Sequence, residues 1–229
     1  MNETGEADQP TLARQPCADT SRPRVADQNM TPSSYFGLRK RAFDLFVVGS
    51  ASLLLLPFFL ILVITIPLII LADDGRPLLF RQRRFGYHRR PLDILKFRTM
   101  VRGAAKQGPE WTLENDSRMT RAGRLLRPTA LDELPQLLNI IKGEMSLVGP
   151  RALSEREFEA IEQEIPEFGQ RLLVPPGLTG IAQVSGGRDD NVQKLSHDLE
   201  YIANASAWLD VKILLSSVRK TALRSWESR

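Results

Sequence analysis

The sequence predicts a mainly α-helical, membrane-associated globular domain with a small β-hairpin and, near its N-terminus, a re-entrant hydrophobic helix that is broken in the middle. Three observations predict this fold. A run of 28 residues without a charge extends over 45–72, short apolar or alternating segments flank a turn at 86–91, and apolar residues recur at helical spacing through the second half of the chain.

Residues 1–34 are predicted to be a disordered tail, because they are rich in polar residues and proline and show no apolar periodicity. Their acidic start argues against a secretory signal peptide. Cys17, the only cysteine, is expected to be a free thiol in this tail. Residues 35–75 are assigned to the broken membrane helix, residues 76–223 to a globular domain, and residues 224–229 to a second tail.

The uncharged run is longer than one membrane span needs, since a straight helix of this length extends about 42 Å and a hydrocarbon core is about 30 Å thick. Pro57 and Pro67 interrupt it, and a proline within a helix removes a hydrogen bond and bends the axis. Basic residues flank the run at 39–41 and at 76–90, and such clusters favour the cytoplasmic side. A helix broken near Pro57 that returns to the same leaflet satisfies both clusters. A single span, the alternative, places one cluster outside.

The globular domain is predicted to begin with the β-hairpin, whose strands contain residues 78–80 and 92–97, followed by a loop over 101–118. Apolar helical faces follow at 125–141, and the stripe of Phe158, Ile161, Ile165 and Phe168 indicates an acidic helix. Residues 175–187 are predicted to be a loop rich in proline and glycine. From Trp208 onward the pattern is amphipathic, so this helix either lies in a membrane interface or, as its composition favours, packs on the core.

Charge is distributed unevenly along the chain. Residues 74–151 hold 16 Lys and Arg against 8 Asp and Glu, whereas residues 152–200 hold 4 against 10. The basic part is suited to an anionic partner, such as nucleic acid, a phosphate-bearing small molecule or anionic lipid. One cysteine and two histidines exclude a disulfide framework and argue against a histidine-based metal site or a Ser/His/Asp triad. The sequence has no P-loop or dinucleotide-binding glycine motif.

Asp132 and Glu133 form the most suggestive short segment. Taken alone, it favours a helix cap, with Asp132 either as the N-cap before Pro135 or closing a capping box with Thr129. Both interpretations place Asp132 at a helix N-terminus, where the dipole stabilises an ionised carboxylate that could act as nucleophile or metal ligand. Adjacent side chains on a helix point about 100° apart, so two distinct roles are more natural than a facing pair.

Many arginines stand around this pair in the sequence: Arg118, Arg121, Arg124, Arg127 and Arg151. The planar guanidinium group is suited to bidentate recognition of phosphate. It is equally suited to a basic surface beside anionic lipid, and each use can hold for different arginines.

Several short segments complete the pattern, in this order: 80–86 (FRQRRFG), 96–100 (KFRTM), 118–123 (RMTRAG), 126–127 (LR), 131–136 (LDELPQ), 143–151 (GEMSLVGPR), 176–184 (PGLTGIAQV) and 201–214. Each is weak alone, but in this order and spacing they are highly specific. The chain resembles the bacterial sugar transferases, the monotopic phosphoglycosyl transferases, from about residue 39 to residue 223.

The resemblance implies an enzyme. Members of that family transfer a sugar-1-phosphate from a UDP-sugar to undecaprenyl phosphate, release UMP, require Mg²⁺ and begin the assembly of a glycan, such as an exopolysaccharide, O-antigen, capsule or glycoprotein. It implies that residues 76–223 are a catalytic domain on the cytoplasmic face of the bacterial inner membrane. Membrane lipid and downstream glycosyltransferases are the further partners it suggests, and nucleic acid is not among them.

The resemblance also implies roles for single residues. Asp132 is expected to be the nucleophile that forms a covalent phosphosugar intermediate, and Glu133 its partner, as metal ligand or general base. Both are candidate ligands of Mg²⁺. Lys96, Arg127 and Arg151 match positions that bind the substrate, through phosphate contacts.

Three positions depart from the family pattern. Ala152 replaces the second proline of Pro-Arg-Pro, Leu56 precedes Pro57 where a serine is common, and residues 185–189 (SGGRD) replace the frequent x-G-R-N ending. The four additional N-terminal spans of larger relatives are absent from this sequence, which is typical of the minimal form. The competing class is a non-enzymatic membrane-anchored protein that binds anionic lipid or nucleic acid. That class gives no reason for a carboxylate pair among arginines.

Overall fold

The computed structural model describes residues 30–108, 116–186 and 190–223. Most of the predicted N-terminal tail, with Cys17, the C-terminal tail and part of the 185–189 segment lie outside these residues. The described helices and strands are α1 Leu38–Leu54, α2 Leu56–Asp74, β1 Leu79–Phe85, β2 Pro91–Phe97, α3 Arg121–Leu126, α4 Leu137–Lys142, β3 Ser146–Val148, α5 Glu155–Glu164, β4 Gly177–Thr179, α6 Ile181–Ser185, α7 Asn191–Asn204 and α8 Ala207–Ala222. The predicted class, mainly helical with a small β-hairpin, is confirmed.

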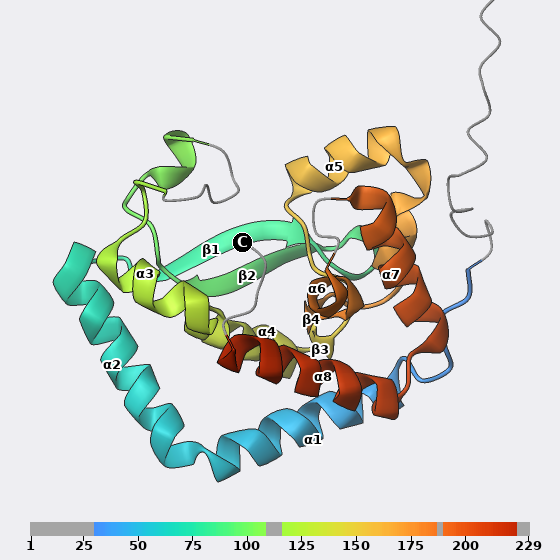
Figure 1. The fold of residues 1–229 in the computed structure, drawn as a ribbon, viewed down its shortest axis with the longest axis horizontal. Coiled ribbons are helices and arrows are strands. Elements are labelled where there is room, and N and C mark those ends of the chain that lie inside the picture. Colours follow the sequence, from blue (N-terminus) through green and yellow to red (C-terminus); the bar gives the residue numbers. More distant parts are fainter. Residues whose placement is uncertain (1–29, 109–115, 187–189, 224–229) are drawn as a thin grey trace, which may run out of the picture.

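The hydrophobic run is divided into two helices that meet at an angle (Figure 1). The break lies at Leu55 (φ −101°, ψ 17°), two residues before Pro57. Proline is tolerated in the first turn of a helix, where its missing N–H has no intrahelical partner, but it cannot continue the helix before it. The break forms without a side-chain cap, so Leu56 in place of serine does not prevent it. Of the described helices, α2 alone is long and apolar enough to cross a membrane, with a mean hydropathy of 2.5.

Polar contacts fasten both outer ends of this helix pair to the globular domain. Near the start of α1, the guanidinium of Arg41 donates to two carbonyls at the C-terminal end of α4. At the end of α2, Arg98 Nη2 donates to the carbonyls of Asp74 (2.9 Å) and Gly75 (2.8 Å). Asp73 accepts a hydrogen bond of 2.7 Å from a backbone N–H in the first turn of α3. Both ends of the hydrophobic run are therefore held by one domain.

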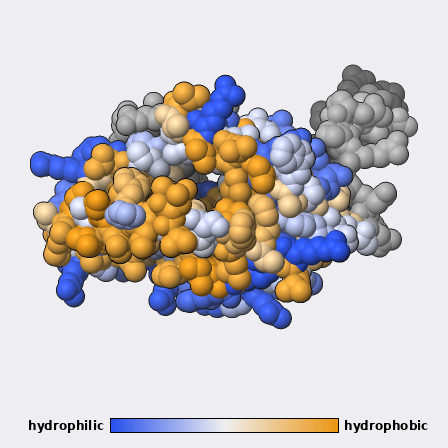
Figure 2. Space-filling model, turned by 90° about the horizontal axis from the view of Figure 1, so that it is seen from below, coloured by the Kyte–Doolittle hydropathy of each residue, from blue (hydrophilic) through white to orange (hydrophobic). Residues whose placement is uncertain are grey.

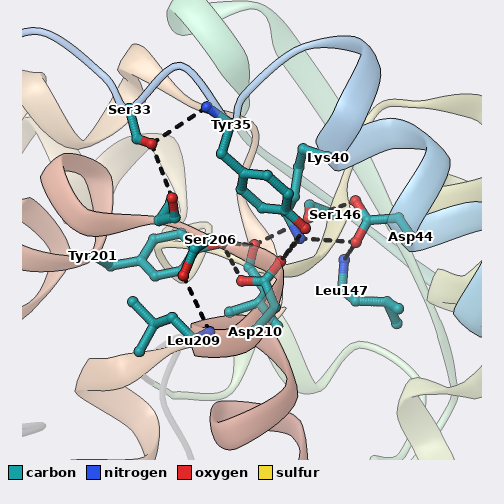
Figure 3. Close-up of polar contacts among 12 residues, drawn as sticks. Ser33, Tyr35, Lys40, Asp44, Ser146, Leu147, Tyr201, Ser206, Leu209 and Asp210 are labelled. Carbon is teal, nitrogen blue, oxygen red and sulfur yellow. Dashed lines mark hydrogen bonds and ion pairs between the residues drawn. The ribbon is translucent and has the colours of Figure 1, made fainter.

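A buried cluster of charges connects α1 to α8 (Figure 3). Lys40 Nζ lies 2.8 Å from a carboxylate oxygen of Asp44 and 2.8 Å from one of Asp210. All three side chains are at most 4% exposed. A buried ion pair is tolerated only when further hydrogen bonds satisfy its oxygens, which the neighbouring hydroxyl groups do here.

Three hydroxyl groups donate to these two carboxylates. Tyr35 and Tyr201 each contact Asp210, at 3.0 and 2.8 Å, and Ser146 Oγ donates to Asp44 at 2.7 Å. Desolvation and the nearby carboxylate raise the pKa of both tyrosines, so they remain hydrogen-bond donors. The network therefore joins α1, β3, α7 and α8. Residue 33, which the sequence analysis placed in the tail, also docks on this region, since its hydroxyl donates to the carbonyl of Ala205.

The predicted β-hairpin is present as β1 and β2, which pair antiparallel from Leu79 opposite Phe97 to Phe85 opposite Pro91. His88 and Arg89 in the connecting turn have positive φ angles. Because opposite residues share one face of the sheet, Arg84, Gln82 and Lys96 lie on the same face, together with buried Leu92 and Ile94. This face carries the site described below.

The segment 175–187, predicted to be a loop, contains β4 and α6, so that prediction is wrong. Strand β4 pairs in parallel with β3, and the two backbone segments approach closely at Gly149 and Gly177. A Cβ on Gly177 would lie 2.1 Å from the backbone nitrogen of Gly149. The same glycines that indicated a loop therefore permit a tight parallel pairing. The predicted acidic helix is α5, but it ends at Glu164, so the stripe is only partly confirmed: Phe158 and Ile161 lie on α5, whereas Phe168 lies in the following 3₁₀-helix Pro166–Leu173 and packs into the same core.

The amphipathic helix predicted from Trp208 is α8, but its apolar face does not pack on the core. Trp208, Leu215 and Val218 are between 64% and 67% exposed, whereas the buried side of the helix carries Asp210 and Ile213. Figure 2 shows apolar side chains gathered over the face of the molecule that α1, α2 and α8 form. We call this face, with exposed apolar residues of α4 at its edge, the apolar underside. A contiguous apolar patch of this kind marks an interaction surface.

Candidate functional site

Asp132 and Glu133 lie in a short 3₁₀-helix, Leu131–Gln136, which packs against β2. Both capping interpretations of Asp132 are wrong, because the N-cap position is taken by Ala130, which adopts a left-handed conformation with φ 55°. The hydroxyl of Thr129 instead donates to backbone carbonyls of α3. Asp132 and Glu133 still occupy the first turn, where exposed backbone N–H groups favour negative charge.

Lys96, Glu133 and Arg151 form a compact cluster of charges. Lys96 Nζ lies 2.9 Å from Glu133 Oε1, and Arg151 Nη2 lies 3.9 Å from the same oxygen. Lys96 and Glu133 are 18% and 10% exposed, and Arg151 is 41% exposed. Residues far apart in the sequence are thus brought together by the hairpin, the 3₁₀-helix and the segment after β3. The site therefore places two cations near one carboxylate oxygen.

The environment of Lys96 favours loss of its proton. Desolvation lowers the pKa of the Lys96 ammonium, and the positive charges of Arg151 and Arg84 act in the same direction. The carboxylates of Glu133 and Asp132 oppose this shift without cancelling it. An anion with more than one negative charge would relieve the repulsion among these cations.

The cluster lines a pocket between the hairpin and the segments around β3 and β4. Its lining includes the charged side chains of Arg84, Lys96, Glu133 and Arg151, together with Met145, Gly177 and Leu178. From the sequence, Arg84 is only one of the basic residues that flank the hydrophobic run, within the segment 80–86. Its alternation with Gln82 on one face of a strand could have indicated its place in the site.

Two of the expected site residues, Asp132 and Arg127, lie outside the pocket lining. Asp132 is 4% exposed and, like Arg127, is not among the described residues that line the pocket. Arg127 Nε donates a hydrogen bond of 2.9 Å to Thr99 Oγ1, at the base of α3. Arg118, one of the predicted arginines, forms a buried pair with Asp116 at 2.6 Å. The predicted ring of arginines is therefore not one surface.

The donor set fits magnesium as a partial site. Within the described ranges, no group of three or more His, Cys, Asp or Glu side chains is placed to hold a metal. Magnesium is commonly bound through one or two carboxylates, with waters and substrate phosphates completing the shell. Glu133 lines the pocket and Asp132 precedes it in the same 3₁₀-helix, so these two would be the carboxylates that hold such an ion.

The chain matches the family model described as bacterial sugar transferase over residues 35–224. It is similar to a UDP-glucose:undecaprenyl-phosphate glucose-1-phosphate transferase from Caulobacter vibrioides, with 40% identity over 189 residues, covering 79% of this chain and 68% of the relative. It is 41% identical over 189 residues to exopolysaccharide production protein PSS from Rhizobium leguminosarum bv. phaseoli, covering 78% of this chain and 92% of that protein.

A third relative is longer. The UDP-N-acetylgalactosamine-undecaprenyl-phosphate N-acetylgalactosaminephosphotransferase of Aeromonas hydrophila is 35% identical over 195 residues, which cover 83% of this chain but 45% of that protein. This chain thus spans less than half the length of that relative. The family match covers the helix pair and the whole described pocket. The chain therefore belongs to the bacterial sugar transferase family.

Proposed function

We propose that this protein transfers a sugar-1-phosphate from a UDP-sugar to undecaprenyl phosphate, through a covalent intermediate on Asp132, as a first membrane step of glycan assembly. Its relatives carry the names of undecaprenyl-phosphate sugar-phosphate transferases and of an exopolysaccharide production protein. The observation that carries the proposal is the Lys96–Glu133–Arg151 cluster, since it places a carboxylate between two cations at a pocket wall, with Asp132 next to it in the chain.

In the first step, a carboxylate oxygen of Asp132 attacks the phosphorus that bears the sugar. A bond between Asp132 and this phosphorus forms, and the bond to the bridging oxygen breaks, so that UMP leaves with the electron pair. In the second step, an oxygen of undecaprenyl phosphate attacks the same phosphorus and releases the carboxylate. Two steps allow a water-soluble donor and a lipid acceptor to use one site in turn.

Lys96 and Arg151 support the first step by binding phosphate oxygens. A carboxylate and a diphosphate repel one another, and fixed cations near the pocket offset this repulsion as charge develops. Glu133 holds both cations in the free protein and releases them in part when the diphosphate enters. Bound Mg²⁺, held by Asp132 and Glu133 with substrate phosphates, would supply further neutralisation of charge.

The apolar underside supports placement at a membrane surface. Trp208 on α8 and the exposed apolar residues of α1 and α2 are suited to the interface and the acyl region. Because the globular domain holds both ends of the helix pair, a re-entrant arrangement keeps the site beside the lipid headgroups. We place the catalytic domain on the cytoplasmic face of the inner membrane, since basic residues flank both helices.

The covalent step is tested with Asp132→Asn, which keeps the size of the side chain but removes its charge. Purified wild-type protein given Mg²⁺ and sugar-labelled UDP-glucose, UDP-galactose or UDP-N-acetylgalactosamine, without polyprenyl phosphate, should retain label on the protein and release UMP. The variant should retain none and should lose turnover by more than about a thousandfold, because a neutral amide is a poor nucleophile. Substantial turnover by a variant free of contaminating enzyme would refute the covalent mechanism.

The re-entrant arrangement is tested by labelling introduced cysteines in a Cys17→Ser background, which has no other cysteine. Arg39→Cys and Arg81→Cys lie on opposite sides of the hydrophobic run and are both exposed. In intact cells, an impermeant reagent added outside should label neither position, whereas permeabilised cells should show both. Labelling of one position only in intact cells would establish a full span.

The break at Pro57 provides a matched comparison. Pro57→Leu restores a backbone N–H between α1 and α2, so the helix should straighten and Arg39→Cys should become labelled from outside. Pro67 lies inside α2 without interrupting it, so Pro67→Leu is the control and should leave the labelling unchanged. Equal labelling of Arg39→Cys in the two variants would show that Pro57 does not cause the helix pair to return to the same side of the membrane.

A further inference from the structure

Two arginine side chains donate hydrogen bonds to the backbone of the segment that carries Arg151. On one side, Arg171 Nη2 donates a hydrogen bond of 3.1 Å to the carbonyl of Arg151. On the other side, Arg84 Nη1 donates to the carbonyl of the next residue, Ala152. Two consecutive carbonyls are therefore held by two guanidinium groups. Both carbonyls directly follow the Cα of Arg151 in the chain, so the two contacts fix the backbone from which the Arg151 side chain projects.

Arg171 is itself fixed by a buried carboxylate. Its Nε and Nη2 lie 2.8 and 2.5 Å from Asp198 Oδ2, and the two side chains are 2% and 1% exposed. The guanidinium also lies over the ring of Phe168, at 4.6 Å from its centre. A buried charge pair stabilises a fold less than well-packed apolar residues often do, so its presence alone does not account for this arginine. Its planar fork joins Asp198 to the Arg151 backbone, which an apolar side chain cannot do.

Backbone hydrogen bonds also restrain the residues just before Arg151. Gly177 N donates to the carbonyl of Pro150 at 2.9 Å, and Gly149 N donates to the carbonyl of Thr179 at 2.8 Å. These bonds fix the start of the segment, whereas the carbonyl of Arg151 relies on the buried guanidinium. Small displacements of a group that binds a reacting phosphate can cost about a hundredfold in rate.

We propose that Arg171, held by Asp198, is a positioning residue that acts through the Arg151 backbone and sets the Arg151 guanidinium beside Glu133. Arg171 is not among the described residues that line the pocket, so its influence on phosphate passes through Arg151. This inference rests on the proposed function, because it assumes that Arg151 binds the phosphates of the donor.

The test is a double-mutant cycle between Arg171→Lys and Arg151→Ala. Arg171 Nη2 contacts both Asp198 and the Arg151 carbonyl while Nε also donates to Asp198. Lysine keeps the positive charge beside Asp198, but its side chain is one atom shorter and has no second donor in place of Nε, so it should lose the reach to the Arg151 carbonyl. With Arg151 present, Arg171→Lys should lower kcat/KM on the order of tenfold. In the Arg151→Ala background it should have no further effect, because the group that it positions is gone. Affinity for UDP in the presence of Mg²⁺, measured in the same four proteins, should show the same coupling without requiring turnover.

Arg118→Lys is the matched control. Arg118 is a buried arginine that pairs with Asp116 and donates to the carbonyl of Ala104, in a different part of the domain. Whatever Arg118→Lys costs in stability or activity, the cost should be the same with and without Arg151. The thermal midpoints of all variants show whether the two buried pairs have been weakened alike.

The outcomes separate the two proposals. An equal effect of Arg171→Lys in both backgrounds would show that Arg171 serves the fold alone, and an absent effect would also overturn the inference. Normal kinetics in Arg151→Ala would overturn the role of Arg151 and this inference, while transfer by the wild type would keep the proposed function. If no UDP-sugar is used by the wild type, the proposed function fails, and UDP binding still decides the coupling.

A second variant covers failure to fold. If Arg171→Lys does not yield folded protein, the neutral pair Arg171→Gln with Asp198→Asn replaces it in the same cycle. Neutral replacement of a buried ion pair is often tolerated, because no unpaired charge remains. This double replacement should also lower kcat/KM when Arg151 is present and have no further effect in the Arg151→Ala background, and an equal effect in both backgrounds would contradict the inference.

Discussion

Two lysines in this protein lie close to carboxylates, and their surroundings differ in the balance of charge and in access to solvent. Lys40 touches Asp44 and Asp210, all at most 4% exposed, and three hydroxyl groups satisfy the remaining carboxylate oxygens. Lys96 touches Glu133 at the wall of a pocket, where desolvation lowers the pKa of its ammonium and the cations of Arg151 and Arg84 act in the same direction. The first cluster has more negative than positive groups, and the second has more positive than negative groups.

The difference separates a structural cluster from a binding cluster. Around Lys40, hydrogen-bond donors already surround the carboxylates, so a ligand would have nothing to add. Around Lys96, burial lowers the pKa and leaves a poorly solvated ammonium at the wall of a pocket, so an anion that binds there stabilises its charge. Burial of a lysine beside a carboxylate is thus not by itself a sign of function. The balance of charge and the access to solvent decide it.

The largest expected effect concerns the structural cluster. Lys40→Met leaves Asp44 and Asp210 buried without their cation and should lower the free energy of unfolding by about 3 to 5 kcal/mol. Thermal and denaturant unfolding in detergent measure this, with kcat/KM determined for the folded fraction. Lys96→Met is the matched comparison and should unfold nearly as the wild type does while losing transfer. If Lys96→Met lost stability and Lys40→Met lost only transfer, the Lys96 cluster would be the structural one and the Lys40 cluster the binding one.

The next effect separates two arginines of the expected site. Arg151→Ala should reduce kcat/KM by about 2 to 4 kcal/mol of transition-state stabilisation, because it removes a charge-assisted phosphate contact. Arg127→Ala removes the contact with Thr99 and was predicted from the sequence to be equally costly. If Arg127→Ala lowers kcat/KM less than Arg151→Ala does, direct phosphate binding belongs to the residues that line the pocket and not to Arg127. Arg90→Ala, in the exposed turn of the hairpin, is the control and should leave steady-state transfer near normal.

The smallest effect is a shift in pH dependence. Because the pKa of Lys96 is lowered, the ammonium loses its proton at a lower pH than an ordinary lysine does. As pH rises through that pKa, the free enzyme loses a phosphate-binding charge, so kcat/KM should fall on the alkaline side. Lys96→Arg, which stays charged, should move this fall to higher pH even if its overall rate is lower. A pH profile unchanged by this substitution would assign the alkaline fall to another group.

Local patterns in the sequence predicted the features that depend on neighbours along the chain. The absence of charge over 45–72 and the place of Pro57 predicted two helices with a break, and alternation at 92–97 predicted the hairpin. In each case, one short segment contains the physical cause.

Features that depend on distant segments were not predictable in this way. The pairing of β3 with β4 requires Gly149 and Gly177 to meet, and neither glycine alone indicates it. The outward face of α8 follows from its other face, where Asp210 meets Lys40 of α1. The resemblance indicated Lys96, Glu133 and Arg151, but not that Arg84 joins them or that Asp132 is almost fully buried. These depend on how the hairpin packs over the 3₁₀-helix.

The close contact between Gly149 and Gly177 limits how this protein can diverge. A single added methyl group at Gly177 would meet backbone atoms, which cannot turn aside as a side chain can. That part of the pocket wall can change only if two separate segments change together. Met145 and Leu178, which line the same pocket through side chains, face no such barrier. Point mutations that reshape this pocket therefore have a path through those two positions, while the backbone that supports them is inherited intact.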